Sequence, residues 1–185
     1  EAYDTAVFSL PDYVQELNTP QVVFPPAIDP FSIANRQLSD EEIDDRLQHY
    51  EIPTDRPLVV QVSRFDRWKD PEGVIEAFKR AREEVDATLV LLGNVATDDP
   101  EGEEVYRSLL DERDERILVI SREDTALVNA LQSRAAVVLQ KSKREGFGLT
   151  VTEAMWKGTP VIGGDVGGIR VQIEDGVNGF LVSSI

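Results

Sequence analysis

The stretch LVVQVSRFDRWKDPEGVIEAFKRAREEVDATLVLLG, residues 58–93, decides the fold class. It opens with the short apolar run LVVQV, rich in β-branched residues, which is typical of a buried strand. A loop follows and ends at Asp70 and Pro71, a pair typical of a helix N-cap and a first helical residue. The apolar residues after them recur at helical spacing, at Val74, Ile75, Phe78 and Ala81. Residues 87–92 give the next apolar run, so this stretch predicts a strand, a helix and a second strand.

The same alternation continues to the end of the chain. Further strands are predicted over residues 116–120, 135–140, 159–162 and 179–182, and helices over residues 100–113, 124–134, 148–157 and 168–175. Strands that alternate with helices pair in parallel and are covered on both faces. We therefore expect residues 57–185 to form a doubly wound α/β domain with a parallel sheet.

The first 56 residues are less regular and are expected to be a lead-in and inter-domain connection. Strands are expected over residues 5–9 and 21–24, and Ser39 with Glu42 predicts a capping box for a helix that runs through His49. The chain does not begin with methionine and starts and stops next to strand-like segments. It therefore reads as a piece of a longer protein.

Composition excludes several classes of function. The 185 residues carry 19 basic and 35 acidic side chains, a formal net charge of −16, which argues against nucleic-acid and anionic membrane partners. Arginine outnumbers lysine 14 to 5, and an acidic, lysine-poor surface resembles that of proteins from cells with high internal salt. The absence of cysteine and the single histidine exclude thiolate and multi-histidine metal sites. No membrane span or signal peptide is recognisable, so a cytoplasmic location is expected.

The loops after the strands are the places to search for a site, because open parallel sheets bind ligands beyond the carboxyl ends of their strands. The loop after residues 58–62 carries Arg64 and Lys69 in a chain that is short of cations. Solvated salt bridges to nearby aspartates are one interpretation, and a clamp on a diphosphate is the favoured one. The loop after residues 87–92 begins with Gly93, a further candidate.

The most informative segment is QKSKREGFGLTVTE, residues 140–153, where a predicted strand turns into a helix. Gly146 and Gly148 allow the backbone to approach a ligand closely. The first N–H groups of the helix, near Leu149 and Thr150, lack partners within the helix and favour an anion. The segment therefore predicts an anion site made by the backbone.

Two glutamates belong to the same segment. Glu145 precedes the turn and Glu153 lies within the predicted helix, and carboxylates suit sugar hydroxyls because they accept hydrogen bonds. A capping box formed by Thr150 and Glu153 is the competing structural interpretation. Both glutamates together with the glycines and the helix start favour a site for a sugar attached to an anion.

Other chemistries lack their residues. There is no P-loop and no GxSxG motif, and residues 146–151 give only half of a dinucleotide fingerprint, which leaves an NAD site as a weak alternative. No two aspartates stand two apart, so a metal bridge to a diphosphate is not expected and cations must neutralise it. We expect neither a metal nor a cofactor.

The segments EGFGLTVTE (145–153), TPVIGGDVGGI (159–169) and EDGVNGFLV (174–182), together with Arg64 and Lys69, resemble the donor half of a retaining GT-B glycosyltransferase of the family 4 type. That family includes sucrose-phosphate and trehalose synthases, and its donor domain is a Rossmann-like parallel sheet. The segments PPAIDPFSIANRQL (25–38) and VSRFDRWKDPEGVIEAF (62–78) are similar to its trehalose-forming synthases. This resemblance implies transfer of glucose from a nucleoside-diphosphate glucose to glucose.

The resemblance also implies roles for individual residues. Arg64 and Lys69 would neutralise the leaving diphosphate, and Glu145 would hold donor-glucose hydroxyls at the reacting carbon. Glu153 would hold the ribose hydroxyls. The backbone N–H groups of five consecutive residues would bind the sugar and the phosphates; they are Gly146, Phe147, Gly148, Leu149 and Thr150. Two hydrophobic residues, Val119 and Ile120, would flank the base.

The acceptor side is expected to lie in an amino-terminal domain that this chain lacks. The chain alone is therefore expected to bind a nucleotide sugar but to turn over poorly or not at all. Two alternatives stay open: the same chemistry with another acceptor, such as fructose, a glycerol derivative or a glycan, and a non-catalytic nucleotide- or sugar-binding module. The sequence does not decide whether the protein forms a homo-oligomer.

Overall fold

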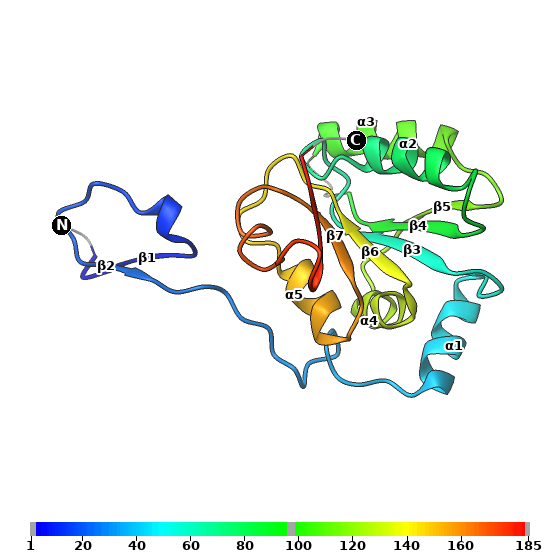
Figure 1. The fold of residues 1–185 in the computed structure, drawn as a ribbon, viewed down its shortest axis with the longest axis horizontal. Helices are drawn as coiled ribbons and strands as arrows, with labels where there is room; N and C mark the ends of the chain where they lie inside the picture. The colour runs from blue at the N-terminus through cyan, green and yellow to red at the C-terminus, as the bar shows by residue number, and fades with distance from the viewer. Residues whose placement is uncertain (1–2, 96–98, 184–185) are drawn as a thin grey trace.

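The computed structural model describes residues 3–95 and 99–183. Its centre is a parallel sheet in the order β5–β4–β3–β6–β7–β8, with every neighbouring pair parallel (Figure 1). The strands are β3 (Leu58–Val62), β4 (Thr88–Gly93), β5 (Ile117–Ser121), β6 (Val137–Gln140), β7 (Val161–Gly164) and β8 (Gly179–Val182). The prediction of an α/β fold with a doubly wound parallel sheet is confirmed.

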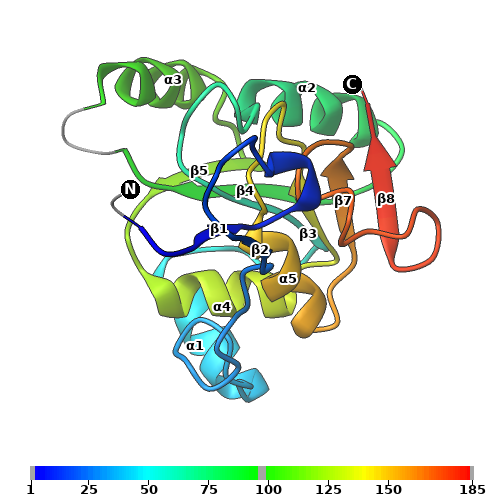
Figure 2. The same ribbon diagram turned by 90° about the vertical axis from the view of Figure 1, so that its left-hand side faces the viewer.

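Helices cover both faces of this sheet (Figure 2). One face carries α2 (Pro71–Ala81) and α3 (Pro100–Asp111), and the other carries α1 (Asp40–His49), α4 (Thr125–Arg134) and α5 (Leu149–Trp156). Two hydrophobic clusters fill the spaces between sheet and helices. Because both faces are covered, the side chains of β4 are buried along its whole length, which explains its unbroken apolar run.

The strand order reverses between β3 and β6. The chain builds β4 and β5 on one side of β3, and then returns to add β6, β7 and β8 on the other. The loops that leave the carboxyl ends of β3 and β6 therefore diverge and leave a crevice between them. In open α/β sheets this switch point is where ligands bind.

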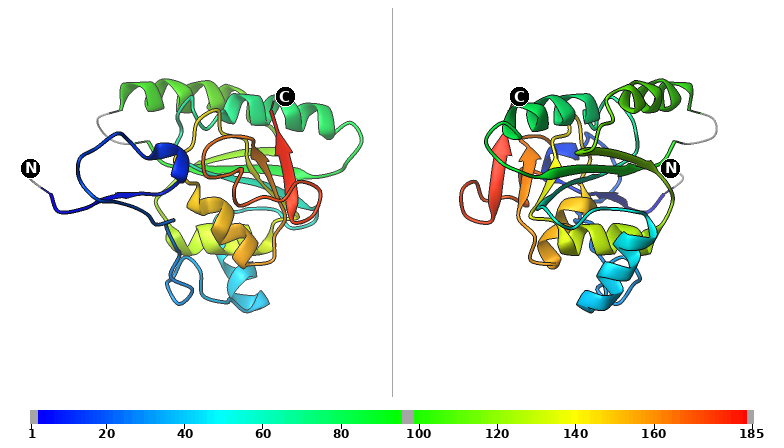
Figure 3. Two further views of the ribbon diagram at one scale, coloured as in Figure 1. Left: turned by 60° about the vertical axis from the view of Figure 1, so that its left-hand side comes forward. Right: turned by 90° about the vertical axis from the view of Figure 1, so that its right-hand side faces the viewer.

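The lead-in forms the two strands that its sequence predicted. β1 (Ala6–Phe8) and β2 (Gln21–Val23) form a parallel pair, with a short 3-10 turn over Pro11–Tyr13 between them. The left-hand view of Figure 3 shows that this pair stands apart from the main sheet. Both strands lie within the predicted segments.

Helix α1 begins as predicted. The Ser39 side chain accepts from the Glu42 N–H, and the Glu42 carboxylate accepts from the Ser39 N–H. Ile43 and Leu47 of this helix pack into the same cluster as β3 and α4. Helix α1 is therefore packed on the sheet domain although it precedes residue 57, and the domain boundary itself stays a prediction.

One predicted element is wrong. The sequence predicts a short helix over residues 168–175. The structure has turns over residues 167–172 instead. Gly167 adopts a left-handed φ of 46°, and the Gly168 N–H donates to the Gly146 carbonyl at 3.1 Å. The backbone of this segment therefore bonds across to the loop after β6 rather than continuing as a helix.

Among the described residues, none of the helices has the length and apolarity that crossing a bilayer requires.

Candidate functional site

An open pocket of about 600 Å³ lies at the switch point of the sheet. Its walls come from the loops after β3, β6 and β7, and from the lead-in. Five cationic and three anionic side chains line it, a formal surplus of two positive charges in a chain of net charge −16. The cations are Arg64, Lys69, Lys143, Arg144 and Arg170. The pocket is therefore suited to an anionic ligand.

The centre of the pocket is an ion pair between its two main loops. Lys69 Nζ donates to Glu145 Oε2 at 2.5 Å, and both side chains are mostly buried, with 17% and 13% exposed. Lys69 follows β3 and Glu145 follows β6, so the pair joins residues that are 76 positions apart in sequence. The structure thus brings Lys69, Glu145 and Arg64 into one pocket, as the sequence predicted.

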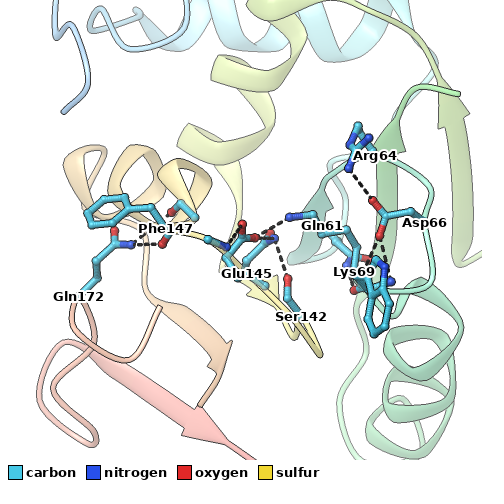
Figure 4. A network of polar contacts seen from close by, with 12 residues as sticks. Gln61, Arg64, Asp66, Lys69, Ser142, Glu145, Phe147 and Gln172 are labelled. Atoms are coloured by element: carbon cyan, nitrogen blue, oxygen red, sulfur yellow. Dashed lines mark hydrogen bonds and ion pairs between the residues drawn. The ribbon is translucent and has the colours of Figure 1, made fainter. Parts of the chain in front are cut away.

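The loop after β3 is held in shape by buried polar side chains. Asp66 is buried, and its Oδ1 accepts from the backbone N–H groups of Trp68 at 2.9 Å and Lys69 at 3.0 Å. Arg64 Nη2 lies 3.2 Å from the other oxygen of the same carboxylate. Gln61, buried in β3, donates to the Lys69 carbonyl at 2.8 Å. Figure 4 shows these groups on the part of the chain that carries Lys69, beside its partner Glu145. The two cations are therefore presented by a rigid loop.

Asp70 has a different role from the one predicted. It occupies the N-cap position of α2, but its side chain caps no helix N–H and its backbone is left-handed, with φ 52°. Its buried carboxylate instead contacts Lys141 and lies 2.7 Å from Lys143 Nζ. A Cβ at Gly73 would lie 2.4 Å from this carboxylate, so glycine is required there. The aspartate links the two loops a second time.

Trp68 and Arg144 form a rim that sequence reasoning missed. The Arg144 guanidinium stacks over the Trp68 ring, with Cζ 4.2 Å from the ring centre. The Lys143 N–H donates to the Trp68 carbonyl at 2.7 Å, which fixes the two loops side by side. A tryptophan inside a cationic loop was the available signal, but its partner lies on another loop.

The turn before α5 presents backbone donors. Gly148 occupies the N-cap position with a left-handed φ of 84°, and no side chain caps this helix start. The capping box of Thr150 and Glu153 is therefore not formed, which removes the structural interpretation of that pair. Among the described residues, the backbone N–H groups of residues 147–150 have no hydrogen-bond partner.

Glu153 lies in a separate polar cluster and does not line the pocket. Its neighbour Lys157 donates to Asn35 Oδ1 and Gln132 Oε1, both at 3.0 Å. Burial raises the pKa of Glu153, whereas it lowers the pKa of Lys157 to about 8. The role of Glu153 as a ribose ligand stays a prediction.

The other predicted contacts are also outside the residues that line this pocket; they are Phe147, Gly148, Leu149, Thr150, Gly93, Val119 and Ile120. Gly93 has a packing reason to be glycine, because a Cβ there would lie 2.2 Å from the Ser63 carbonyl oxygen. Val119 is buried in a core cluster and Ile120 is half-buried. Their contacts with a ligand stay predictions.

Comparison with protein-family models identifies residues 42–184 as "Glycosyl transferases group 1". Trehalose synthase from Thermococcus litoralis is 45% identical over the whole chain, and the alignment covers 47% of that protein. Trehalose synthase from Pyrococcus horikoshii is 47% identical over 98% of the chain and 46% of its own length. Trehalose phosphorylase from Grifola frondosa is 34% identical over 68% of the chain and 19% of its own length. The chain thus spans about half the length of the trehalose synthases that it matches.

Solved structures agree on the fold. Sucrose-phosphate synthase from Thermosynechococcus elongatus superposes with a TM-score of 0.77 at 25% identity, covering 97% of this chain and 45% of that one. HepE from Anabaena, solved in complex with UDP-glucose, superposes with a TM-score of 0.72 at 24% identity, covering 89% of this chain and 44% of that one. These neighbours are GT-B glycosyltransferases, so they support the fold. The family model that matches residues 42–184 shows that the chain belongs to the group 1 glycosyltransferases.

Proposed function

We propose that the chain is the donor-binding half of a retaining glycosyltransferase that moves glucose from a nucleoside-diphosphate glucose to a sugar acceptor. We further propose that the acceptor is glucose and the product trehalose, a reading supported by the high identity to trehalose synthases along the whole chain. The observation that carries the proposal is the cationic pocket at the switch point, centred on the Lys69–Glu145 pair. HepE, with the same fold, was solved with UDP-glucose.

Arg64 and Lys69 would bind the diphosphate and stabilise the charge that develops on it as the glycosidic bond to glucose breaks. Charge-assisted hydrogen bonds of this kind are short and strong, and preorganised charges of this kind are the main source of catalysis in many enzymes. Lys69 is held by its hydrogen bond to Glu145, whereas Arg64 is 66% exposed and lies 3.2 Å from Asp66 Oδ2. Little reorganisation of Lys69 is therefore needed when the leaving group forms.

Glu145 would serve two purposes. Its Oε2 accepts from Lys69, and its Oε1 accepts from the Gly146 N–H at 3.1 Å. A carboxylate has about four lone-pair positions, so both oxygens can accept a further bond from a sugar hydroxyl. The same carboxylate would thus orient the cation under the phosphate and the glucose beside it.

The proposal dispenses with a metal ion, because the pocket supplies its own positive charge. The acceptor would be held by a domain outside this chain, so the acceptor could differ from glucose within the same family. A module that binds nucleotide sugars without turning them over is the alternative from another class. It would need Glu145 only as the partner of Lys69, and not as a ligand of the sugar.

Isothermal titration of the chain with UDP, ADP, GDP and UDP-glucose, each in EDTA, tests the proposal. We expect at least one nucleoside diphosphate to bind, and the matching nucleoside alone to bind far more weakly, since the phosphates meet the cations. Failure of every nucleoside diphosphate and of UDP-glucose to bind would contradict it. Formation of trehalose from a nucleoside-diphosphate glucose and glucose by the full-length protein, with release of the nucleoside diphosphate, then tests the acceptor. Transfer to fructose or a glycan instead would select the other acceptors.

A further inference from the structure

The carbonyl groups of the turn over residues 145–148 are all engaged from outside the turn. The Tyr13 hydroxyl lies 3.0 Å from the carbonyl oxygens of both Glu145 and Gly146. The Gly146 carbonyl also accepts from the Gly168 N–H at 3.1 Å. The Phe147 carbonyl faces Gln172, which lies in the turns after β7. The Gly148 carbonyl accepts from the Val151 N–H at 2.9 Å and also lies near Gln172.

Gln172 Nε2 lies 2.7 Å from the Phe147 carbonyl oxygen, 3.0 Å from that of Gly168 and 3.4 Å from that of Gly148. At its other end, Oε1 lies 2.5 Å from Thr152 Oγ1. Three carbonyls can only accept, so they need the amide nitrogen, and the Thr152 hydroxyl can then donate to the amide oxygen. The hydrogen-bond network thus fixes the orientation of the Gln172 amide, with Thr152 holding it from behind.

This contact sets the direction of the backbone N–H groups in the turn. In a planar trans peptide the carbonyl and the following N–H point in opposite directions. The Phe147 carbonyl points to Gln172, so the Gly148 N–H points away from it. Figure 4 shows Gln172 and Lys69 on opposite sides of the turn, with Phe147 and Glu145 between them. The Gly148 N–H, which has no partner among the described residues, is therefore left available for a ligand.

We propose that Gln172 is a positioning residue for donor binding: by holding the carbonyls behind the turn, it aims the Gly148 N–H at the anionic part of the donor. The inference rests on the proposed function, and Gln172 itself touches no substrate. Tyr13 contacts the two preceding carbonyls, which share its single hydroxyl hydrogen. Residues distant in sequence thus decide what the glycine-rich turn presents.

A purely structural role for Gln172 would have different requirements. The segment is anchored in the core by Ile169 and Ile173, which are almost fully buried, whereas Gln172 is only partly buried. An apolar side chain of equal size could fill the same space, but it would leave the Phe147 and Gly168 carbonyls without the Gln172 amide as donor. Binding, rather than folding, should therefore respond most to its loss.

The test compares Gln172→Leu with Gln48→Leu, a matched change at an exposed site on α1. Affinities for inorganic pyrophosphate and for UDP are measured by titration, thermal unfolding is recorded, and the Gly148 amide resonance is followed by NMR. In the wild type we expect ligand to shift that resonance. We expect Gln172→Leu to weaken binding about tenfold, the effect of one lost hydrogen bond to a charged group, and to reduce the shift. Gln48→Leu should change neither the affinity nor the ligand-induced shift of the Gly148 resonance.

Thr152→Val is a second variant, in case Gln172→Leu fails to fold. It keeps the amide but releases its orientation, so a loss of affinity of a few-fold is expected. Wild-type affinity and an unchanged Gly148 shift in the folded variants would overturn the role of Gln172. If the wild type itself binds neither ligand nor any other nucleoside diphosphate, the proposed function fails, and the positioning role with it.

Discussion

The two loops that face each other across the crevice bind anions by different means. The loop over residues 63–70 offers side-chain cations, Arg64 and Lys69, each paired with a carboxylate. The turn over residues 145–148 offers backbone N–H groups, aimed by the donors that hold its carbonyls. Anion binding by side chains depends on which residues are present, whereas anion binding by backbone N–H groups depends on the orientation of the peptide groups. Different substitutions should therefore abolish anion binding by the two loops.

The largest effect is expected at the link between the loops. Asp70→Ala removes the buried partner of Lys141, whose side chain is only 14% exposed, and leaves that ammonium unpaired. Breaking a buried ion pair in this way costs about 3–5 kcal/mol of unfolding free energy. Asp86→Ala is the control, because Asp86 pairs with Arg56 and Arg116 at 65% exposure and should cost about 0–1 kcal/mol. Urea unfolding measures both, and equal small losses would show that Asp70 does not brace the loops.

The turn over residues 145–148 should be most sensitive to a methyl group added where Gly168 packs against it. A Cβ at Gly168 would lie 2.3 Å from Phe147 Cα and 2.4 Å from its carbonyl oxygen, so Gly168→Ala must push the turn away. Overpacking of this kind costs about 1–3 kcal/mol. Gly146→Ala is the matched control, since a Cβ there meets nothing within 4 Å. Thermal or urea unfolding that ranks the two variants equally would contradict the close approach of the loops.

Glu145 belongs to both loops, so its removal should separate their contributions. Glu145→Ala frees Lys69 from its carboxylate and leaves the cation to a diphosphate. We expect UDP-glucose to lose about tenfold more affinity than UDP, because only the glucose moiety loses its hydrogen-bond acceptor. Titration with both ligands measures the difference. An equal loss for UDP and UDP-glucose would contradict the role of the carboxylate at the sugar.

The smallest effect concerns Lys157, outside the pocket. Burial lowers its pKa from 10.5 to about 8, so between these pH values the unfolded chain binds more protons than the folded one. The unfolding free energy should therefore rise with pH across this window. Because the side chain is only half-buried, we expect a gain of about 1 kcal/mol. Urea unfolding of the wild type and Lys157→Met at both ends of the window gives the difference, and an identical pH dependence would exclude this titration.

The contrast between the loops also explains what could be predicted from the sequence. The apolar runs of β3 and β4 and the capping box of Ser39 are local signals, and they predicted strands, helix starts and the class of fold. Arg64, Lys69 and Glu145 could be predicted because each follows a strand whose carboxyl end must meet the others at the switch point. Strand order alone brings them together.

What could not be predicted depends on partners far away in the chain. Asp70 resembled a helix cap, but lysines after β6 take its carboxylate. The segment after β7 resembled a helix, but its backbone bonds to the turn at Gly146. Tyr13 and Gln172 carry no motif, because what they contribute is a hydrogen bond to another loop's carbonyls. Such residues become visible only once the loops are placed.

The central claim is that the loop after β3 and the turn after β6 enclose one diphosphate. The most direct measurement is the affinity of Lys69→Ala for the nucleoside diphosphate that the wild type binds best. Lys79→Ala serves as the control, because Lys79 pairs with Glu112 away from the pocket. We expect Lys69→Ala to lose about 1.5–3 kcal/mol of binding free energy and Lys79→Ala to lose none. Wild-type affinity in Lys69→Ala would contradict the claim.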